Sequence, residues 1–152
     1  MGVHDRLTEL GVELPAVTPP IASYVPVVLA GGLAFVSGQV PLVEGQILHP
    51  GHLGREVTIE QGQEAARRCA LSALAALAAE LGTLDRVRRV VSVSVFVASA
   101  PGFTDQPKVA NGASDFLGEV FGEAGKHSRA AVGVAELPLG APVEVAVTVE
   151  VG

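Results

Sequence analysis

Residues 127–151 of this chain read HSRAAVGVAELPLGAPVEVAVTVEV and contain two strand-like runs separated by a turn with proline and glycine. In the second run, Val143–Val151, every other residue is a valine. Valine favours strands, and a period of two places alternate residues on one face. The sequence therefore predicts two final strands, about Ala130–Leu137 and Val143–Val151, with the valine face of the last strand in the core.

One arginine and one glutamate stand near the starts of these two runs. The planar guanidinium of Arg129, called its fork below, stays charged and can bind a carboxylate through two parallel hydrogen bonds. Glu144 would gain a raised pKa in a partly dry site and could then exchange protons near neutral pH. The pair predicts a small site for a carboxylate-bearing molecule. Two alternatives stay open: Arg129 could cap the sheet or pair with Glu136, and Glu144 could face a partner or solvent.

A β-hairpin is predicted upstream, where Gly31-Gly32 separates the apolar runs Tyr24–Ala30 and Leu33–Val40. Two-residue hairpin turns favour residues that adopt positive φ, which suits two glycines. Pro26 cannot donate to a strand ladder, so the first strand is expected at the edge of the sheet. The segment Glu44–Val57 contains several glycines and prolines and is predicted to be a loop.

Two helices are predicted in the middle of the chain. The first begins after Thr58, which forms a capping box with Gln61, and ends at Leu81 before a glycine stop at Gly82. The second spans roughly Pro107–Gly122. Their apolar residues recur at the three- and four-residue spacing of a helix with one buried face.

The run between the helices, Val87–Ala98, predicts a further strand. Its core face is expected to carry Val91, Val93, Val95 and Val97. The element order is then ββαβαββ, an α+β fold with two helices packed on one face of a sheet. The other sheet face is small and partly polar, which favours packing against another subunit. Residues 1–152 are expected to form a single domain, in which 1–23 is a Pro-rich N-terminal lead with a short helix at Asp5–Leu10.

Composition narrows the possible functions. The chain is 49% hydrophobic and 17% charged, with a formal net charge of −6. This balance opposes binding to phosphate backbones, and the absence of tryptophan leaves few stacking platforms. No apolar stretch reaches the roughly 18 residues of a membrane span, and the first residues lack the apolar core of a secretory signal. We therefore expect a cytoplasmic protein whose partners include neither nucleic acid nor a membrane.

Metals and other cofactors are not expected. Cys69 is the only cysteine, which excludes an internal disulfide framework and makes a zinc cluster implausible. It lies in an Ala/Leu-rich helix, where free cysteine behaves as a small hydrophobe. His49 and His52 are three residues apart in a loop and have no obvious third ligand.

Several short motifs occur in one order between about Tyr24 and Val151. They are Phe35-Val36-Ser37-Gly38-Gln39-Val40-Pro41, an Ala-rich helix ending in Leu81-Gly82, Val95-Phe96-Val97, Phe103 with Asn111, Arg129-Ala130-Ala131-Val132, Leu137-Pro138 and Val143-Glu144-Val145. In order and spacing they resemble the reactive intermediate deaminase (Rid) family, also called the YjgF or L-PSP endoribonuclease family. The Pro-rich lead, the long loop and the stretch Asn111–Asp115 resemble a longer subgroup of that family.

The resemblance implies a chorismate-mutase-like fold with a mixed sheet, in which the final strand lies beside the first hairpin. It implies a homotrimer with clefts between subunits. The implied reaction is hydrolytic deamination of small enamine/imine acids, such as 2-aminoacrylate, to 2-keto acids and ammonia. By position, Arg129 would hold the substrate carboxylate and Glu144 would position water or shuttle a proton. The implied pocket-lining residues are Tyr24, Ser37, Gly38 and Asn111, with the Ser37 hydroxyl and the Gly38 amide as carboxylate donors.

Some features leave alternatives open. Many family members have a cysteine two residues after the arginine, where this chain has Ala131, so no thiol role is expected. Tyr24 could be a packing residue, and Asn111 could bond to local backbone. His127 could be a pocket wall or a weak base, although a surface histidine is the favoured interpretation.

Two other functions compete with the deaminase. The first is a non-catalytic trimeric binding protein that senses a small keto acid or related metabolite, and Glu144 separates the two because turnover requires it more than binding does. The second is a ribonuclease, which the acidic charge disfavours. Neither intrachain pairing of the last strands nor any other local feature brings Arg129 and Glu144 together, so we expect a site shared between subunits.

Overall fold

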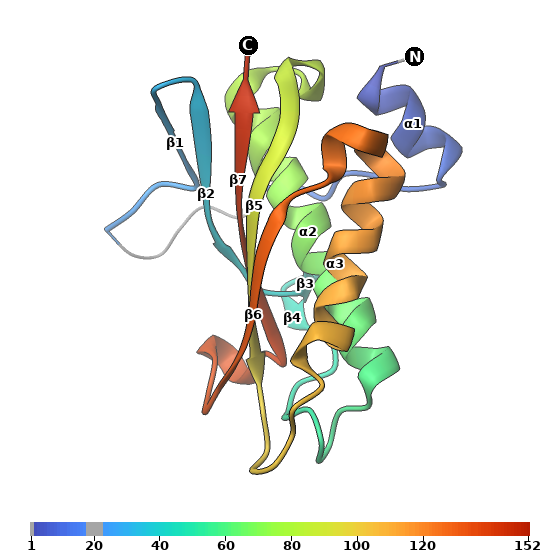
Figure 1. Ribbon diagram of the computed structural model, residues 1–152, viewed down its shortest axis with the longest axis vertical. Coiled ribbons are helices and arrows are strands. Elements are labelled where there is room, and N and C mark those ends of the chain that lie inside the picture. Colours follow the sequence, from blue (N-terminus) through green and yellow to red (C-terminus); the bar gives the residue numbers. More distant parts are fainter. Residues whose placement is uncertain (1, 18–22) are drawn as a thin grey trace.

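The computed structural model describes residues 2–17 and 23–152 and contains one five-stranded sheet with helices packed on one side (Figure 1). The strand order is β1-β2-β7-β5-β6. The strands are β1 (Val27–Ala30), β2 (Leu33–Gln39), β5 (Val87–Ala98), β6 (Ser128–Val134) and β7 (Val143–Val151). β5 and β6 run parallel and the other neighbours run antiparallel. The predicted α+β fold with a mixed sheet is confirmed.

The first hairpin forms with the predicted turn, but β1 begins at Val27, three residues after the predicted Tyr24, and β2 ends at Gln39 rather than Val40. Gly31 and Gly32 both have positive φ, 58° and 77°, which a two-residue turn requires. β1 lies at one edge of the sheet, directly after Pro26. The partner β2 contains an irregularity against β7 between Val36 and Gln39, so Ser37 and Gly38 bulge out of the ladder.

Two long helices cover one face of the sheet. Helix α2 (Ile59–Leu81) begins with the predicted capping box, in which Thr58 Oγ1 accepts from the Gln61 amide and the Gln61 side chain accepts from the Thr58 amide. Gly82 has a φ of 83° and ends the helix. Helix α3 (Gln106–Phe121) packs beside α2, and Figure 1 shows both helices on the same side of the sheet.

The N-terminal helix α1 (Val3–Glu9) begins two residues earlier than predicted. Its Leu7 is buried, and the Val3 amide donates to Asp85 Oδ1. The prolines of the predicted lead at 19–20 lie outside the described residues. In the part of the chain that the structure describes, no helix has the length and apolar character needed to cross a membrane.

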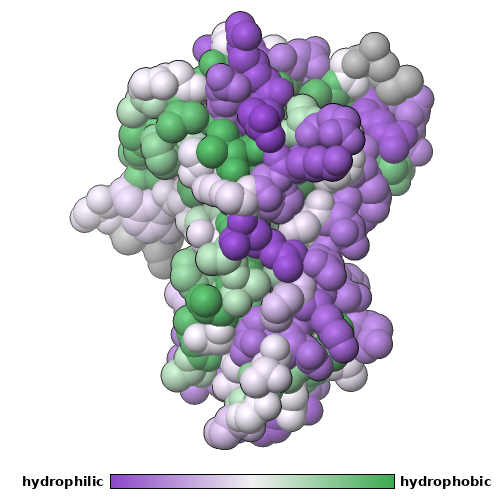
Figure 2. Space-filling model, in the orientation of Figure 1, coloured by the Kyte–Doolittle hydropathy of each residue, from purple (hydrophilic) through white to green (hydrophobic). Residues whose placement is uncertain are grey.

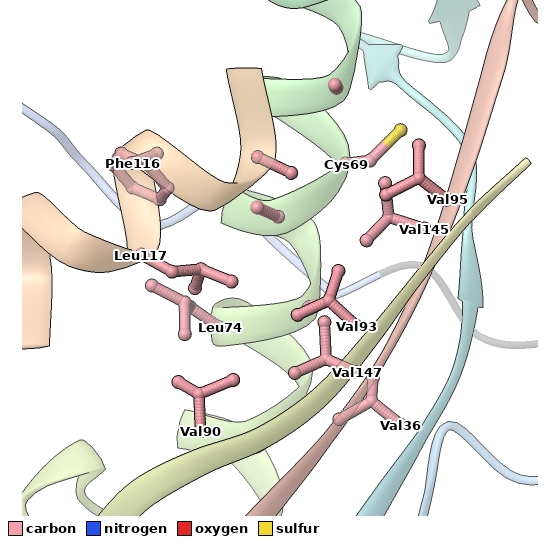
Figure 3. Close-up of a cluster of buried hydrophobic side chains, with 14 of the residues drawn as sticks. Val36, Cys69, Leu74, Val90, Val93, Val95, Phe116, Leu117, Val145 and Val147 are labelled. Carbon is pink, nitrogen blue, oxygen red and sulfur yellow. The ribbon is translucent and has the colours of Figure 1, made fainter. Parts of the chain in front are cut away.

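The core lies between the sheet and the helices. Figure 3 shows valines of β5 and β7 opposite Leu74 of α2 and Phe116 and Leu117 of α3. The alternating valines of β7 from Val143 to Val149 are at most 2% exposed, as the period-two pattern predicts. Cys69 is fully buried among them, and desolvation raises the pKa of its thiol, so it acts as a packing residue.

Three local predictions were wrong. The predicted loop contains a small hairpin of β3 (Leu42–Val43) and β4 (Gln46–Ile47), because Glu44 and Gly45 adopt the positive φ values of a tight turn. In β5 the buried residue is Val90 rather than Val91, because an irregularity against β7 shifts the register there. β6 ends at Val134, three residues before the predicted Leu137.

Candidate functional site

Arg129 and Glu144 project from opposite faces of the sheet. Arg129 of β6 is paired with Val93 of β5, whose side chain is buried beneath the helices. Glu144 of β7 is paired with Phe96 and alternates with buried valines, so its side chain points to the open face. Paired residues in a ladder share a face. The two side chains therefore do not meet within one chain.

The Arg129 side chain lies against helix α3. Its Nη1 donates to Asn111 Oδ1 at 2.8 Å and to Ser114 Oγ at 3.1 Å. Its Nη2 donates to the Pro107 carbonyl at 3.4 Å. Asn111 and Ser114 are three residues apart and so share one face of the helix. The Nε–H and one Nη2–H of Arg129 have no partner among the described residues and remain free to bind an anion.

Two alternatives that the sequence left open, one for Arg129 and one for Asn111, were wrong. Arg129 does not pair with Glu136, whose carboxylate lies 3.2 Å from His52 Nε2 instead. The Asn111 side chain accepts from Arg129 rather than from local backbone. The sequence predicted Asn111 beside Arg129 only through the family resemblance, because the two residues are 18 positions apart.

His127 is not the surface histidine that the sequence favoured. Its ring is partly buried, with Nδ1 2.6 Å from the Gly125 carbonyl and Nε2 2.9 Å from Ser114 Oγ. Ser114 thus links His127 to Arg129. Sequence reasoning missed Ser114, although its three-residue spacing from Asn111 was a usable signal once Asn111 had been singled out.

Glu144 rests against the bulge of β2. A β-carbon added to Gly38 would overlap the Glu144 carboxylate, so a glycine is required for this approach. Glu144 is partly buried, and desolvation raises its pKa above the ordinary value of 4.5. No described side chain forms an ion pair with Glu144, so no neighbouring positive charge offsets the effect of desolvation on its pKa.

Ser37 ties the bulge to the segment before β1. Its amide donates to the Pro26 carbonyl at 2.8 Å, and its hydroxyl donates to the Val25 carbonyl at 2.7 Å. The hydroxyl hydrogen is therefore already used, and donation to a substrate would require this bond to break. The bond instead fixes the segment that carries Tyr24, a residue 51% exposed beside the exposed Val25.

The open face of the sheet, predicted to be small and partly polar, also carries several exposed large apolar side chains. Exposed large hydrophobic residues on or beside it are Tyr24, Val25, Val28, Phe35 and Val132. Figure 2 shows hydrophobic residues gathered on the strand side of the molecule and hydrophilic residues over the helices. Several exposed apolar side chains on one face are typical of a surface that another protein covers.

Further polar features lie in the groove between α2 and α3 and in the loop before α2. A groove of about 340 Å³ between α2 and α3 is lined mainly by charged and amide side chains, and Asn111 reaches it. His49 pairs with Glu64 at 2.9 Å. Across residues 2–17 and 23–152, no group of three or more His, Cys, Asp or Glu side chains could hold a metal ion.

The topology, with two helices on a mixed sheet and the last strand inserted between β2 and β5, defines a chorismate-mutase-like protein. Residues 4–151 match the family model described as "YjgF/chorismate_mutase-like, putative endoribonuclease". The chain belongs to this family. Protein TCP17 of Trypanosoma cruzi is 51% identical over 149 residues, which cover 97% of this chain and 93% of TCP17.

Solved structures divide into two levels of similarity. Atu1372 of Agrobacterium tumefaciens, described as having unknown function, is 45% identical with a TM-score of 0.92, covering 99% of this chain and 92% of Atu1372. A Shewanella oneidensis protein, described as a "putative endoribonuclease", is 33% identical with a TM-score of 0.96, covering 99% of this chain and 100% of that protein. Escherichia coli TdcF with bound serine is 22% identical with a TM-score of 0.63, covering 90% and 94%, and shares the fold.

Proposed function

We propose that this protein hydrolyses small reactive enamine/imine acids to 2-keto acids and ammonia, in clefts between the subunits of a homotrimer. The observation that carries the proposal is the separation of the two groups: an arginine with a free donor edge on one face and a half-dry carboxylate on the other. The two groups can act on one substrate only in a cleft that both faces reach, and a second subunit would supply that cleft. Arg129 would then bind the substrate carboxylate, and Glu144 would be the acid–base group beside it.

Arg129 would anchor the substrate carboxylate. Its Nε and Nη2 lie on one edge of the guanidinium, and that edge matches the two oxygens of a carboxylate. The three hydrogen bonds from Nη1 and Nη2 to α3 hold the fork before the ligand arrives. Holding the fork in advance lowers the entropy cost of binding. Asn111 contributes by orienting Arg129.

Glu144 would supply the proton transfers. A carboxyl group with a raised pKa can donate a proton to the enamine carbon, which gives the protonated imine. The resulting carboxylate can then accept a proton from the water that attacks the C=N carbon, which gives a carbinolamine. Glu144 would pass that proton to the amino group, ammonia would leave, and the hydroxyl proton would return to Glu144 as the C=O bond forms. The imine carbon is already electrophilic, so the required work is positioning and proton transfer. Gly38 and Tyr24 would form walls of the same cleft.

The open face supports the assembly. If the β6 edge of each subunit meets the open face of the next, the contact is heterologous, and a rotation of one third of a turn between neighbours closes it into a ring of three. Three copies would then form three equivalent clefts, each with Arg129 from one subunit and Glu144 from its neighbour. Burial of exposed apolar residues such as Phe35 and Val132 would stabilise the ring.

The direct test uses freshly generated 2-aminoacrylate and follows pyruvate and ammonia release with and without the protein. Acceleration that is lost in Arg129→Ala supports the proposal. The same rate of release with and without the protein, over several imino acids, would refute it.

The alternative function is a trimeric sensor of a small keto acid or related metabolite. It is favoured by the serine bound to TdcF, which shows that a protein of this fold holds a small carboxylate-bearing molecule. Calorimetry with 2-oxobutanoate separates the two functions. A sensor binds this ligand but releases no ammonia from any imino acid. The hydrolase binds the ligand and also releases ammonia from imino acids.

A further inference from the structure

Three polar side chains, from helix α3, strand β6 and the loop before β6, form one hydrogen-bonded chain beneath this edge strand. Arg129 Nη1 donates to Ser114 Oγ at 3.1 Å, and Ser114 Oγ lies 2.9 Å from His127 Nε2. His127 Nδ1 lies 2.6 Å from the Gly125 carbonyl, in the short 3₁₀ helix Gly122–Gly125 that follows α3. We propose that Ser114 and His127 are positioning residues that fix the Arg129 fork for carboxylate binding. This inference rests on the role proposed above for Arg129.

The donors and acceptors in this chain have one consistent direction. A backbone carbonyl only accepts, so His127 Nδ1 carries the hydrogen that points to Gly125. In the neutral ring Nε2 then accepts, and the Ser114 hydroxyl donates to it. This leaves a lone pair of Ser114 Oγ directed at Arg129 Nη1. The backbone of the 3₁₀ helix thereby sets the orientation of the guanidinium through two side chains.

The bond from Ser114 has a specific effect on the fork. Both hydrogens of Nη1 are occupied, one by Asn111 and one by Ser114, so the guanidinium plane is fixed rather than free to rotate. The fixed plane turns the Nε edge away from α3. Loss of Ser114 would leave only the bond to Asn111 and the long 3.4 Å bond to the Pro107 carbonyl, and the fork would sample several orientations.

A serine beside a histidine also has the form of a nucleophile and its base. Here the serine oxygen already accepts from Arg129, and the hydroxyl lies partly buried on the face of α3 that packs against β6. A nucleophile needs an open approach to its oxygen, which the guanidinium occupies. The geometry therefore favours positioning over covalent chemistry.

The test compares Ser114→Ala and His127→Leu with the conservative Ser114→Thr, which keeps a hydroxyl. Ser72→Ala on α2 is the matched control, because it removes a partly buried helix serine outside the network. Binding of 2-oxobutanoate and of uncharged 2-oxobutanamide is measured by calorimetry. We expect the keto acid to bind about tenfold more weakly to the first two variants, since a bond to a charged group is lost. The control and Ser114→Thr should stay within about threefold of wild type, and amide binding should not change.

Where imine turnover is measurable, KM should rise in Ser114→Ala with little change in kcat. Arg129 holds the carboxylate in the ground state and the transition state alike, so its misplacement removes uniform binding. A merely structural defect would lower kcat and weaken both ligands together. That result, or labelling of Ser114 by a fluorophosphonate, would overturn the positioning role.

A nuclear magnetic resonance measurement separates this inference from the proposed function. In the ¹⁵N-labelled protein, His127 should show the Nδ1–H tautomer. Arg129 should show a separately resolved signal for each Nη1 hydrogen, because both hydrogens are bonded and rotation about Cζ–Nη1 is hindered. Ser114→Ala should abolish that resolved Arg129 signal even if the protein binds no keto acid. A folded Ser114→Ala variant with an unchanged Arg129 signal would refute the inference, whatever the protein hydrolyses.

Discussion

Gly38 lies so close to the Glu144 carboxylate that a β-carbon at this position would overlap Oε2. The contact joins a bulge in β2 to the start of β7, two strands that are paired in the sheet. It gives the glycine a steric role that is independent of any donor function of its amide.

Gly38→Ala should therefore displace the Glu144 side chain. A displaced acid–base group costs up to about a hundredfold in rate. Stability should change by no more than about 0.5 kcal/mol, because the overlapping atoms belong to the mobile end of the Glu144 side chain, which can move away. Steady-state kinetics and urea unfolding test this prediction. Wild-type turnover in Gly38→Ala would contradict the proposed role of Glu144.

The raised pKa of Glu144 predicts a pH dependence of stability. Desolvation disfavours the ionised form in the folded protein, so the folded state holds its proton to higher pH than the unfolded state. The free energy of unfolding of the wild type, relative to Glu144→Gln, should fall as pH rises from about 4.5 through the raised pKa. Urea unfolding of both proteins between pH 4 and 8 measures this difference. A relative stability that rises with pH would mean that the carboxylate is stabilised.

Mixed assemblies test the shared cleft. Inactive Arg129→Ala and Glu144→Ala subunits, mixed in equal amounts, should regain about a quarter of the wild-type activity per cleft. Each cleft takes Arg129 from one subunit and Glu144 from its neighbour. In an equal mixture half of the subunits carry each group, so about a quarter of the clefts contain both. Sedimentation confirms that the trimers are mixed. If both groups act from one chain, verified mixed trimers stay inactive, and a monomer in sedimentation rejects the shared cleft.

Arg129→Lys separates the charge from the fork. Lysine keeps the positive charge, but its ammonium group cannot present two parallel N–H groups to a carboxylate. Affinity for 2-oxobutanoate should fall about tenfold or more in Arg129→Lys and further in Arg129→Ala. Calorimetry gives both values. Equal affinity of wild type and Arg129→Lys would show that charge alone is sufficient.

Features of the fold that depend on neighbours in the sequence were predictable. The Gly31-Gly32 turn, the Thr58 cap and the valine alternation of β7 each follow from residues a few positions apart. The site was harder to predict because its contacts cross between elements. Ser114 and His127 are 13 positions apart, and a helix–strand packing decides that they meet.

Register irregularities were a second source of error. Val90 and Val91 are the same residue type, so composition cannot say which one is buried after a bulge. The same limit applies to Ser37 and Gly38, whose displacement from the ladder depends on pairing with β7. The family resemblance identified these positions as pocket residues, but only the structure showed that the Ser37 hydroxyl is used within the chain.

The burial of the only thiol provides a built-in probe of unfolding. Cys69 is inaccessible between α2 and the sheet, so a thiol reagent should modify the protein only when that layer opens. The labelling rate, followed by intact mass, would then report the opening equilibrium without any engineered label. A substrate-like ligand that binds between subunits should slow this labelling in proportion to its occupancy.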